Sequence, residues 1–226
     1  MFDLSLKRRQ REWAANTFEG DYYDYLREAV ADRLVDRLDD ILRDFEIALD
    51  LGCHKGFIRD AMVRENLLSS GRGIGGIKKL LQVDIADFRS HINSKSVPEN
   101  SLFESEFVLQ EKDSFSLEPE SVNLVMSSLW MHWVNDIPSL LKDIHRCLKP
   151  DGAFIATMLG GSTLEELRHS FYLAELERRG GVAPHMSPLV RPSDAAALLQ
   201  GAGFSLPTID IDTITVWHCY EICDVM

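Results

Sequence analysis

Short β-like runs alternate with amphipathic stretches along most of the chain. Apolar residues recur every three or four positions at 22–42, from Phe57 onward, at 137–148 and at 194–200, which predicts helices there. The β-like runs lie between them, at 46–51, 77–85, 106–110, 121–129 and 153–158. This alternation predicts a mostly parallel sheet with helices on both faces. A further β-rich segment is predicted at 208–217.

The boundaries of two later helices carry their own signals. Asn135, Asp136 and Pro138 predict a helix start with a polar cap and a proline in the first turn. Ser162 and Thr163 each precede a glutamate by three residues, which is the capping-box pattern of another helix start. We expect that second helix to end at Gly180-Gly181.

Composition narrows the class of protein. With 226 residues, 45% of them hydrophobic, the chain has enough apolar surface for one sizeable core. A formal net charge of −12 argues against a nucleic-acid partner, which would require clustered Lys and Arg. One basic run, Lys7 to Arg11, could contact an organic anion or membrane surface or be the stub of a targeting segment, but a solvated helix face is favoured. No apolar run reaches the length of a membrane span.

The four cysteines, at 53, 147, 219 and 223, form no Cys-x-x-Cys pair. A reducing compartment is therefore favoured over a disulfide framework, and a zinc site is not predicted. Cys219 and Cys223 are expected to be buried thiols or loop residues.

Two glycine clusters could bind a nucleotide. Residues 71–76 satisfy the G-x-G-x-x-G spacing, but a β-like run follows them and no strand precedes them, whereas the fingerprint requires a strand before and a helix after. The stretch DLGCHKGF at 50–57 passes that test, because a strand ends at Asp50 and a helix begins near Phe57. We therefore expect the cofactor turn at 50–57 and a loop at 71–76.

A second acid strengthens the case for a nucleoside cofactor. Asp84 ends the second predicted strand, where a carboxylate can accept hydrogen bonds from both hydroxyls of a ribose. Taken singly, Asp50 could cap the following helix and Asp84 could form a turn. The combined pattern of strand, Asp50, Gly52, Gly56, helix, strand and Asp84 favours a nucleoside.

Four sequence blocks together resemble a known superfamily. The blocks ALDLGC at 48–53, QVDIA at 82–86, LVMSSLWMHWVND at 124–136 and LKPDG at 148–152 resemble the seven-stranded S-adenosylmethionine-dependent methyltransferases. Three further blocks, at 7–15, 164–177 and 184–188, resemble the arginine-hydroxylating assembly factors of mitochondrial complex I within that superfamily. The first four blocks are shared with malonyl-carrier-protein methyltransferases, and the terminal blocks select the assembly factors.

The resemblance implies a fold and a site. The fold would be α/β: a class I Rossmann-like methyltransferase sheet over residues 21–226, preceded by a basic arm at 1–20. Relative to the family, this domain could be truncated at its C-terminus. S-adenosylmethionine would be the cofactor. By resemblance its site comprises ten positions: Asp50, Gly52, Cys53, His54, Gly56, Asp84, Ile85, Glu111 near the adenine, and Ser127 and Leu129 facing the space of methyl transfer.

The resemblance also implies a setting and a partner. The protein would modify an arginine of a complex I subunit in the mitochondrial matrix, peripheral to the inner membrane. His132 and Trp133 are candidates for the acceptor pocket, although a buried, hydrogen-bonded histidine and a core tryptophan are the favoured interpretations. No His-x-Asp or His-x-Glu pair indicates an iron triad, so the sequence identifies neither a metal nor the oxidant.

Three departures from the family pattern bear on function. His54 stands where the family has a glycine, residues 69–76 form an apparent insertion, and the family continues beyond Met226. A side chain at position 54 can block close approach of the cofactor, and a positive φ there would add strain of roughly 1 kcal/mol. Two alternatives therefore stay open: an O-methyltransferase acting on a carrier-bound or small carboxylate, and a non-catalytic binding module with a decayed cofactor site.

Overall fold

The computed structural model describes residues 2–17, 20–41, 43–68, 77–95, 103–110, 117–183 and 189–216. The predictions for Glu111, for residues 69–76 and 184–188, and for Cys219 and Cys223 lie outside these ranges. In chain order the described elements are α1 (Leu4–Asn16), η1 (Gly20–Tyr23), α2 (Tyr25–Asp39), β1 (Ile47–Leu51), α3 (Phe57–Leu68), β2 (Lys79–Asp84), α4 (Arg89–Ser94), β3 (Glu104–Leu109), β4 (Val122–Ser128), η3 (Met131–Trp133), α5 (Ile137–Cys147), β5 (Leu148–Thr157), α6 (Glu165–Arg179) and α7 (Pro192–Gly201).

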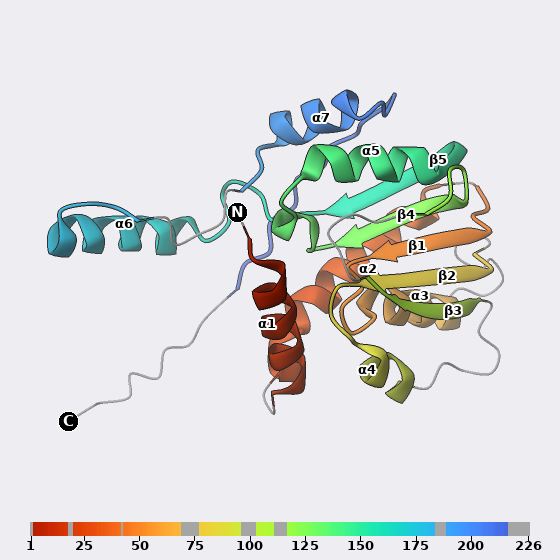
Figure 1. Cartoon of the computed structure of the whole chain (residues 1–226), viewed down its shortest axis with the longest axis horizontal. Helices are drawn as coiled ribbons and strands as arrows, with labels where there is room; N and C mark the ends of the chain where they lie inside the picture. The colour runs from red at the N-terminus through yellow and green to blue at the C-terminus, as the bar shows by residue number, and fades with distance from the viewer. Residues whose placement is uncertain are drawn as a thin grey trace.

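The sheet has β1 at its centre (Figure 1). Its five strands run in the order β3-β2-β1-β4-β5, and every neighbouring pair is parallel. This arrangement confirms the predicted class I fold, although the described residues form five strands rather than seven. Because all strands point the same way, the ends of β1, β2 and β4 meet at one edge, where such sheets bind ligands.

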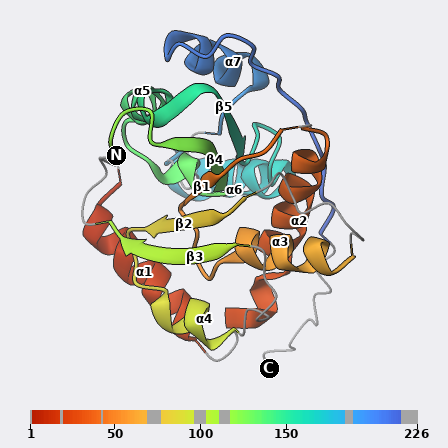
Figure 2. The same ribbon diagram turned by 90° about the vertical axis from the view of Figure 1, so that its right-hand side faces the viewer.

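Helices cover both faces of the sheet, α2 and α3 on one side and α5 with α7 on the other (Figure 2). Successive residues of β1 serve opposite faces: Ala48 packs in the cluster with α2 and α3, and Leu49 packs in the cluster with α5. Since both faces are covered, β1 is apolar at nearly every position rather than alternating with polar residues. The exception is Asp50, which is also buried.

The prediction of a strand at 208–217 is wrong for the described part of that segment. Residues 207–216 form no regular structure and pair with no strand. They run past α2 instead, where Arg37 binds Asp210 at 2.6 Å and Arg33 binds Asp212. These ion pairs involve side chains only and provide no backbone partners of the kind that a neighbouring strand offers. The apolar alternation of this segment is therefore not enough to make it a strand.

The two predicted helix starts have different outcomes. α5 begins as expected, with Asp136 Oδ1 accepting a hydrogen bond from the Ser139 N–H at 3.0 Å. The capping boxes of α6 are wrong: Thr163 belongs to a turn in which its N–H donates to the Gly160 carbonyl at 3.0 Å, and Leu164, at φ 51°, separates it from the helix. α6 ends at Gly180 as predicted, in the left-handed conformation.

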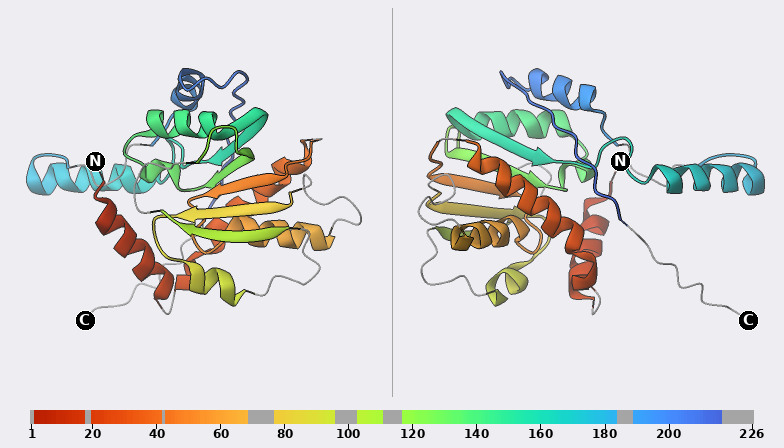
Figure 3. Two further views of the ribbon diagram at one scale, coloured as in Figure 1. Left: turned by 45° about the vertical axis from the view of Figure 1, so that its right-hand side comes forward. Right: turned by 180° about the vertical axis from the view of Figure 1, so that it is seen from behind.

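α6 projects away from the sheet, as both views of Figure 3 show. Its apolar side chains, among them Leu167, Leu173 and Leu176, are exposed. No helix within the described ranges is both long and apolar enough to cross a membrane.

Candidate functional site

The turn after β1 is fixed by backbone bonds and requires glycine. The N–H groups of Gly52 and Cys53 both donate to the Val83 carbonyl, at 2.8 and 3.2 Å, which ties the turn to the end of β2. Gly52 and Gly56 have φ of +81° and +83°. A Cβ on Gly52 would lie 2.0 Å from Cγ of Trp130, so position 52 has no space for a side chain.

His54 adopts the left-handed conformation, with φ 51°, so the condition for backbone strain at this position is met. Its N–H donates to Oδ2 of Asp84 at 2.9 Å, and its ring lies 4.5 Å from the ring of Phe88 and 5.6 Å from that of Phe57. Burial, with the charge of Arg11 next, lowers the pKa of His54, so the ring is neutral. The side chain that replaces a family glycine therefore fills space beside the turn.

Two acids stand at the carboxyl ends of β1 and β2, and both are buried, with Asp50 0% and Asp84 1% exposed. Asp84 accepts bonds from the N–H groups of His54 and Ala86, the latter at 3.0 Å, so it does form the turn considered as an alternative. Asp50 is different, because neither of its oxygens has a hydrogen-bond partner among the described residues. It therefore does not cap α3, and burial together with the charge of Asp84 raises its pKa well above the usual value.

Arg11 reaches the acid pair from α1. Its Nη2 lies 2.5 Å from Oδ2 of Asp84, which places a guanidinium on the acid predicted to hold a ribose. The pair joins residues far apart in the sequence, and α1 must lie across the edge of the sheet to form it.

The rest of α1 is attached along its length. The N–H of Phe2 donates to Oδ1 of Asn135 at 2.7 Å, Lys7 Nζ lies 3.7 Å from the ring centroid of Trp133, and His91 Nε2 is 3.0 Å from the Ala15 carbonyl oxygen. The expectation of a solvated basic face is therefore wrong for Lys7 and Arg11, which face the site. It holds for the neighbouring Arg9, which is exposed.

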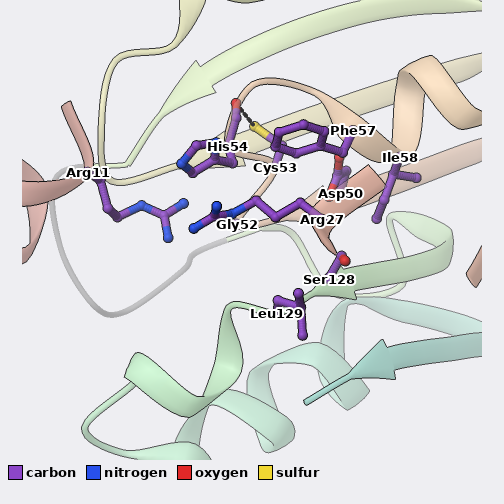
Figure 4. Close-up of a pocket in the computed structure, with 10 residues that line it drawn as sticks. All are labelled: Arg11, Arg27, Asp50, Gly52, Cys53, His54, Phe57, Ile58, Ser128 and Leu129. Carbon is purple, nitrogen blue, oxygen red and sulfur yellow. Dashed lines mark hydrogen bonds between the residues drawn. The ribbon is translucent and has the colours of Figure 1, made fainter. Parts of the chain in front are cut away.

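A small cavity lies beside the turn after β1 (Figure 4). Its volume is about 10 Å³, which is room for about one water molecule. The lining comes from α1, α2, the turn, α3 and the end of β4: Arg11, Arg27, Asp50, Gly52, Cys53, His54, Phe57, Ile58, Ser128 and Leu129. A nucleoside requires far more room, so the acid pair is closed off in this arrangement.

The cavity includes some of the predicted site residues from β1 and β4 and omits others. Leu129 lines it, at φ 49°, but Ser127 points elsewhere and donates through Oγ to the Leu51 carbonyl at 2.8 Å. Its neighbour Ser128 takes the place facing the cavity. Cys53 lines the cavity, and burial raises its pKa, whereas Ile85 is buried and is not part of the lining.

His132 and Trp133 lie on η3, beside the cavity rather than in it. His132 is buried, which lowers its pKa to about 4, but its Nδ1 has no hydrogen-bond partner among the described residues, so the expected hydrogen bond is not seen at that atom. Trp133 is only half buried and binds Lys7 through its ring, so it is not the core residue that the sequence suggested.

The sequence does not indicate Arg27 or Ser128 as site residues, and it favours a solvent-exposed face for Arg11. Arg11 lies four residues after Lys7, so a helix places both on one face, but nothing in the sequence shows that this face meets the sheet. For Arg27 the sequence gives no signal, since its position at the start of α2 reads as an ordinary polar site. Within the described ranges, no group of three or more His, Cys, Asp or Glu side chains could hold a metal ion.

Comparison with known proteins agrees with this fold. Residues 49–156 match the family described as methyltransferase domain. The chain superposes on a putative methyltransferase from Haloferax volcanii, solved with its Trm112 activator, with a TM-score of 0.59 at 19% identity, over 85% of this chain and 75% of that one. It also matches an Aquifex aeolicus methyltransferase with a TM-score of 0.54, over 90% of this chain and 89% of the other. The chain therefore has the class I methyltransferase fold.

In sequence, the chain is similar to proteins named mitochondrial arginine-hydroxylase NDUFAF5. It is 41% identical to the one from Danio rerio and 43% identical to the one from Homo sapiens, over 96% of this chain in each case. The chain spans 63% and 58% of the lengths of these relatives.

Proposed function

We propose that this chain is part of an arginine-hydroxylating assembly factor for mitochondrial complex I, which modifies an arginine of a complex I subunit and binds S-adenosylmethionine or its product at the 50–57 turn. The observation that carries the proposal is the similarity to arginine-hydroxylase NDUFAF5 over 96% of the chain. A mitochondrial location is supported by the names of those relatives, and within the organelle we propose the matrix, peripheral to the inner membrane. The net charge of −12 suits a basic, arginine-bearing substrate.

The residue types at the turn fit a nucleoside cofactor. Gly52 and Gly56 have the positive φ that a tight turn requires, and the unpartnered Asp50 carboxylate is ready to accept hydrogen bonds from a ligand. Asp84 would hold the ribose, but only after Arg11 leaves it, because the cavity of about 10 Å³ admits no nucleoside. The cofactor supplies a methyl group when bound, and hydroxylation requires a separate oxidant.

Calorimetric titration of the purified chain with S-adenosylmethionine tests the cofactor. We expect weak binding to the natural sequence and tighter binding to His54→Gly, since that change removes the ring that fills space beside the turn. Absence of heat with both proteins would remove the cofactor from the proposal.

Mass spectrometry tests the modification. Complex I subunits from cells that lack this protein should have lost one oxygen atom from a specific arginine, and restoring the protein should return it. Unchanged arginine masses in both cells would contradict the hydroxylase assignment.

Two other functions have an observation in their favour. A malonyl-[acyl-carrier protein] O-methyltransferase from Methylovorus is 26% identical over 94% of this chain, which keeps methyl transfer to a carboxylate as a candidate. Transfer of labelled methyl from S-adenosylmethionine to a malonyl carrier protein would establish it. The second is a non-catalytic binding module, which is favoured because His54 and Arg11 together close the site. The absence of heat in both titrations above would support it.

A further inference from the structure

α6 projects from the sheet beyond a bridge between Gly160 and Val190 (Figure 1). Every side chain of α6 except that of Glu175 is exposed. Its large apolar side chains are each between 43% and 50% exposed: Leu167, Phe171, Tyr172, Leu173 and Leu176. A helix of 15 residues is only marginally stable in water, and helices in proteins are normally stabilised by burying an apolar face. The surface of α6 therefore fits a partner that covers it.

One side of α6 has the spacing of a seam between paired helices. Steps of four and three residues keep side chains on one face of a helix. Five positions follow these steps: Glu165, His169, Tyr172, Leu176 and Arg179. Tyr172 is the midpoint, with Glu165 seven residues before it and Arg179 seven residues after it. The seam thus has an acid at one end, a base at the other and apolar side chains at and beside its centre.

This order of charges is complementary to a second copy of itself. If two α6 helices pair antiparallel about a two-fold axis at Tyr172, Glu165 of each copy lies opposite Arg179 of the other. A parallel pair would place like charges opposite each other at both ends. The acid in the first turn and the base in the last also suit the dipole of a single helix, but that accounts only for the charges and leaves the apolar side chains in water.

The end charges and the attachment of α6 both permit this pairing. Within one chain, Nη1 of Arg179 lies 3.7 Å from Oε1 of Glu175, beyond hydrogen-bond distance, so the guanidinium can bind a further carboxylate. Glu165 is five residues from Gly160, so the start of α6 is the end that adjoins the sheet. Antiparallel pairing therefore places the two sheets at opposite ends of the helix pair, where they do not collide.

We propose that the seam of α6 binds the same seam of a second copy of this chain, so that the protein forms an antiparallel two-fold dimer. The dimer goes beyond the proposed function and does not depend on the cofactor. One helix from each chain is a small interface, so the dissociation constant should be on the order of 10 µM. At about 1 µM most chains are single and Leu176 behaves as a surface residue, so unfolding at that concentration reports on the monomer.

Sedimentation equilibrium of the whole chain tests the dimer. Between about 1 and about 300 µM, the mass should rise from 25.6 kDa towards twice that value. Leu176→Asp places a carboxylate beside the centre of the seam and should weaken association about a hundredfold. Leu206→Asp is the matched control, because Leu206 is 91% exposed outside α6 and its replacement should leave association unchanged.

Charge reversal tests the antiparallel direction. Glu165→Arg and Arg179→Glu each place like charges opposite each other at both ends, and each alone should weaken association about tenfold. A mixture of these two variants restores opposite charges at both ends, so a mixed dimer should form with the affinity of the natural chain. Glu177→Arg is the control, since position 177 lies on another side of the helix and should have no effect.

Three results would each overturn the inference. A natural chain that stays monomeric at 300 µM would leave α6 to a different kind of partner. A dimer that Leu176→Asp does not weaken would have its interface elsewhere. A mixture of the two charge variants that associates no better than either alone would exclude the antiparallel pair. Circular dichroism verifies that each variant is folded, and the charge variants keep the test open if Leu176→Asp is not.

Discussion

Glycines with positive φ occur in two regions of the molecule whose packing differs. One region is the edge of the sheet around Asp50 and Asp84, and the other follows β5. Gly52 at the edge and Gly180 at the end of α6 both have positive φ, +81° and +66°. A Cβ on Gly52 would clash with Trp130, whereas a Cβ on Gly180 meets nothing within 4 Å.

The same contrast holds for apolar side chains. Leu34 on α2 is 1% exposed, and Leu176 on α6 is 49% exposed. Leu34 lies in a packed core, and Leu176 presents its side chain outward. Sequence pattern does not separate the two, since both helices carry regularly spaced leucines, so the surroundings decide what each residue contributes.

The largest expected effect is at the glycines. Gly52→Ala combines the strain of a left-handed alanine with overpacking against Trp130, and it should lower the free energy of unfolding by about 4 kcal/mol. Gly180→Ala has only the strain and should cost about 1 kcal/mol. Urea unfolding of both variants measures the difference, and equal losses would contradict the contrast between the regions.

Leucine truncation should follow the same order. Leu34→Ala leaves a cavity in the cluster between α2, α3 and the sheet and should cost about 3 kcal/mol. Leu176→Ala removes an exposed side chain and should cost less than about 0.5 kcal/mol. A large loss at Leu176 in the same unfolding experiment would show that α6 is covered in solution.

Removing Arg11 tests whether α1 belongs to the packed region. Arg11→Ala leaves the buried Asp84 with its two backbone donors but without its cation, and should cost about 2 kcal/mol, the scale of a charge-assisted hydrogen bond. Arg8→Ala, on the more exposed side of the same helix, should cost less than about 0.5 kcal/mol. Equal effects in urea unfolding would mean that the Arg11 pair does not hold α1.

The smallest effect is a dependence on pH at His132. Burial lowers the pKa of His132 from 6.5 to about 4, so between these pH values the unfolded chain binds a proton that the folded chain does not. The free energy of unfolding therefore falls as pH drops through this window. His132→Gln should make the fall shallower without abolishing it, because the pKa of His54 is lowered as well. Urea unfolding at pH 5 and pH 7 measures this fall for both proteins. If the free energy of unfolding changes by the same amount between the two pH values in His132→Gln as in the natural chain, the prediction is wrong.

The backbone of the site could be predicted from sequence because it is local. The order strand, Asp50, glycine turn, helix is a contiguous pattern, and Asp84 follows from the end of the next strand. His54 stands out for the same reason, because it lies within that contiguous pattern, but the sequence alone does not give its φ of 51°.

The closure of the site could not be predicted in this way. The Arg11 pair joins positions 73 residues apart, and no local pattern indicates which face of α1 meets the sheet. The strand predicted at 208–217 is wrong for a related reason. The alternation in this segment is typical of a strand, but a strand also requires a neighbouring strand, and the segment lies against α2 instead.

The attachment of Phe2 to Asn135 sets an order of assembly on the ribosome. These partners are 133 residues apart, so the contact cannot form until more than half of the chain has been synthesised. β1 and β2 are complete by residue 84, so Arg11 and Asp84 can meet before Asn135 is made. The start of α1, although it is synthesised first, is therefore fixed in place only after β4 has been made.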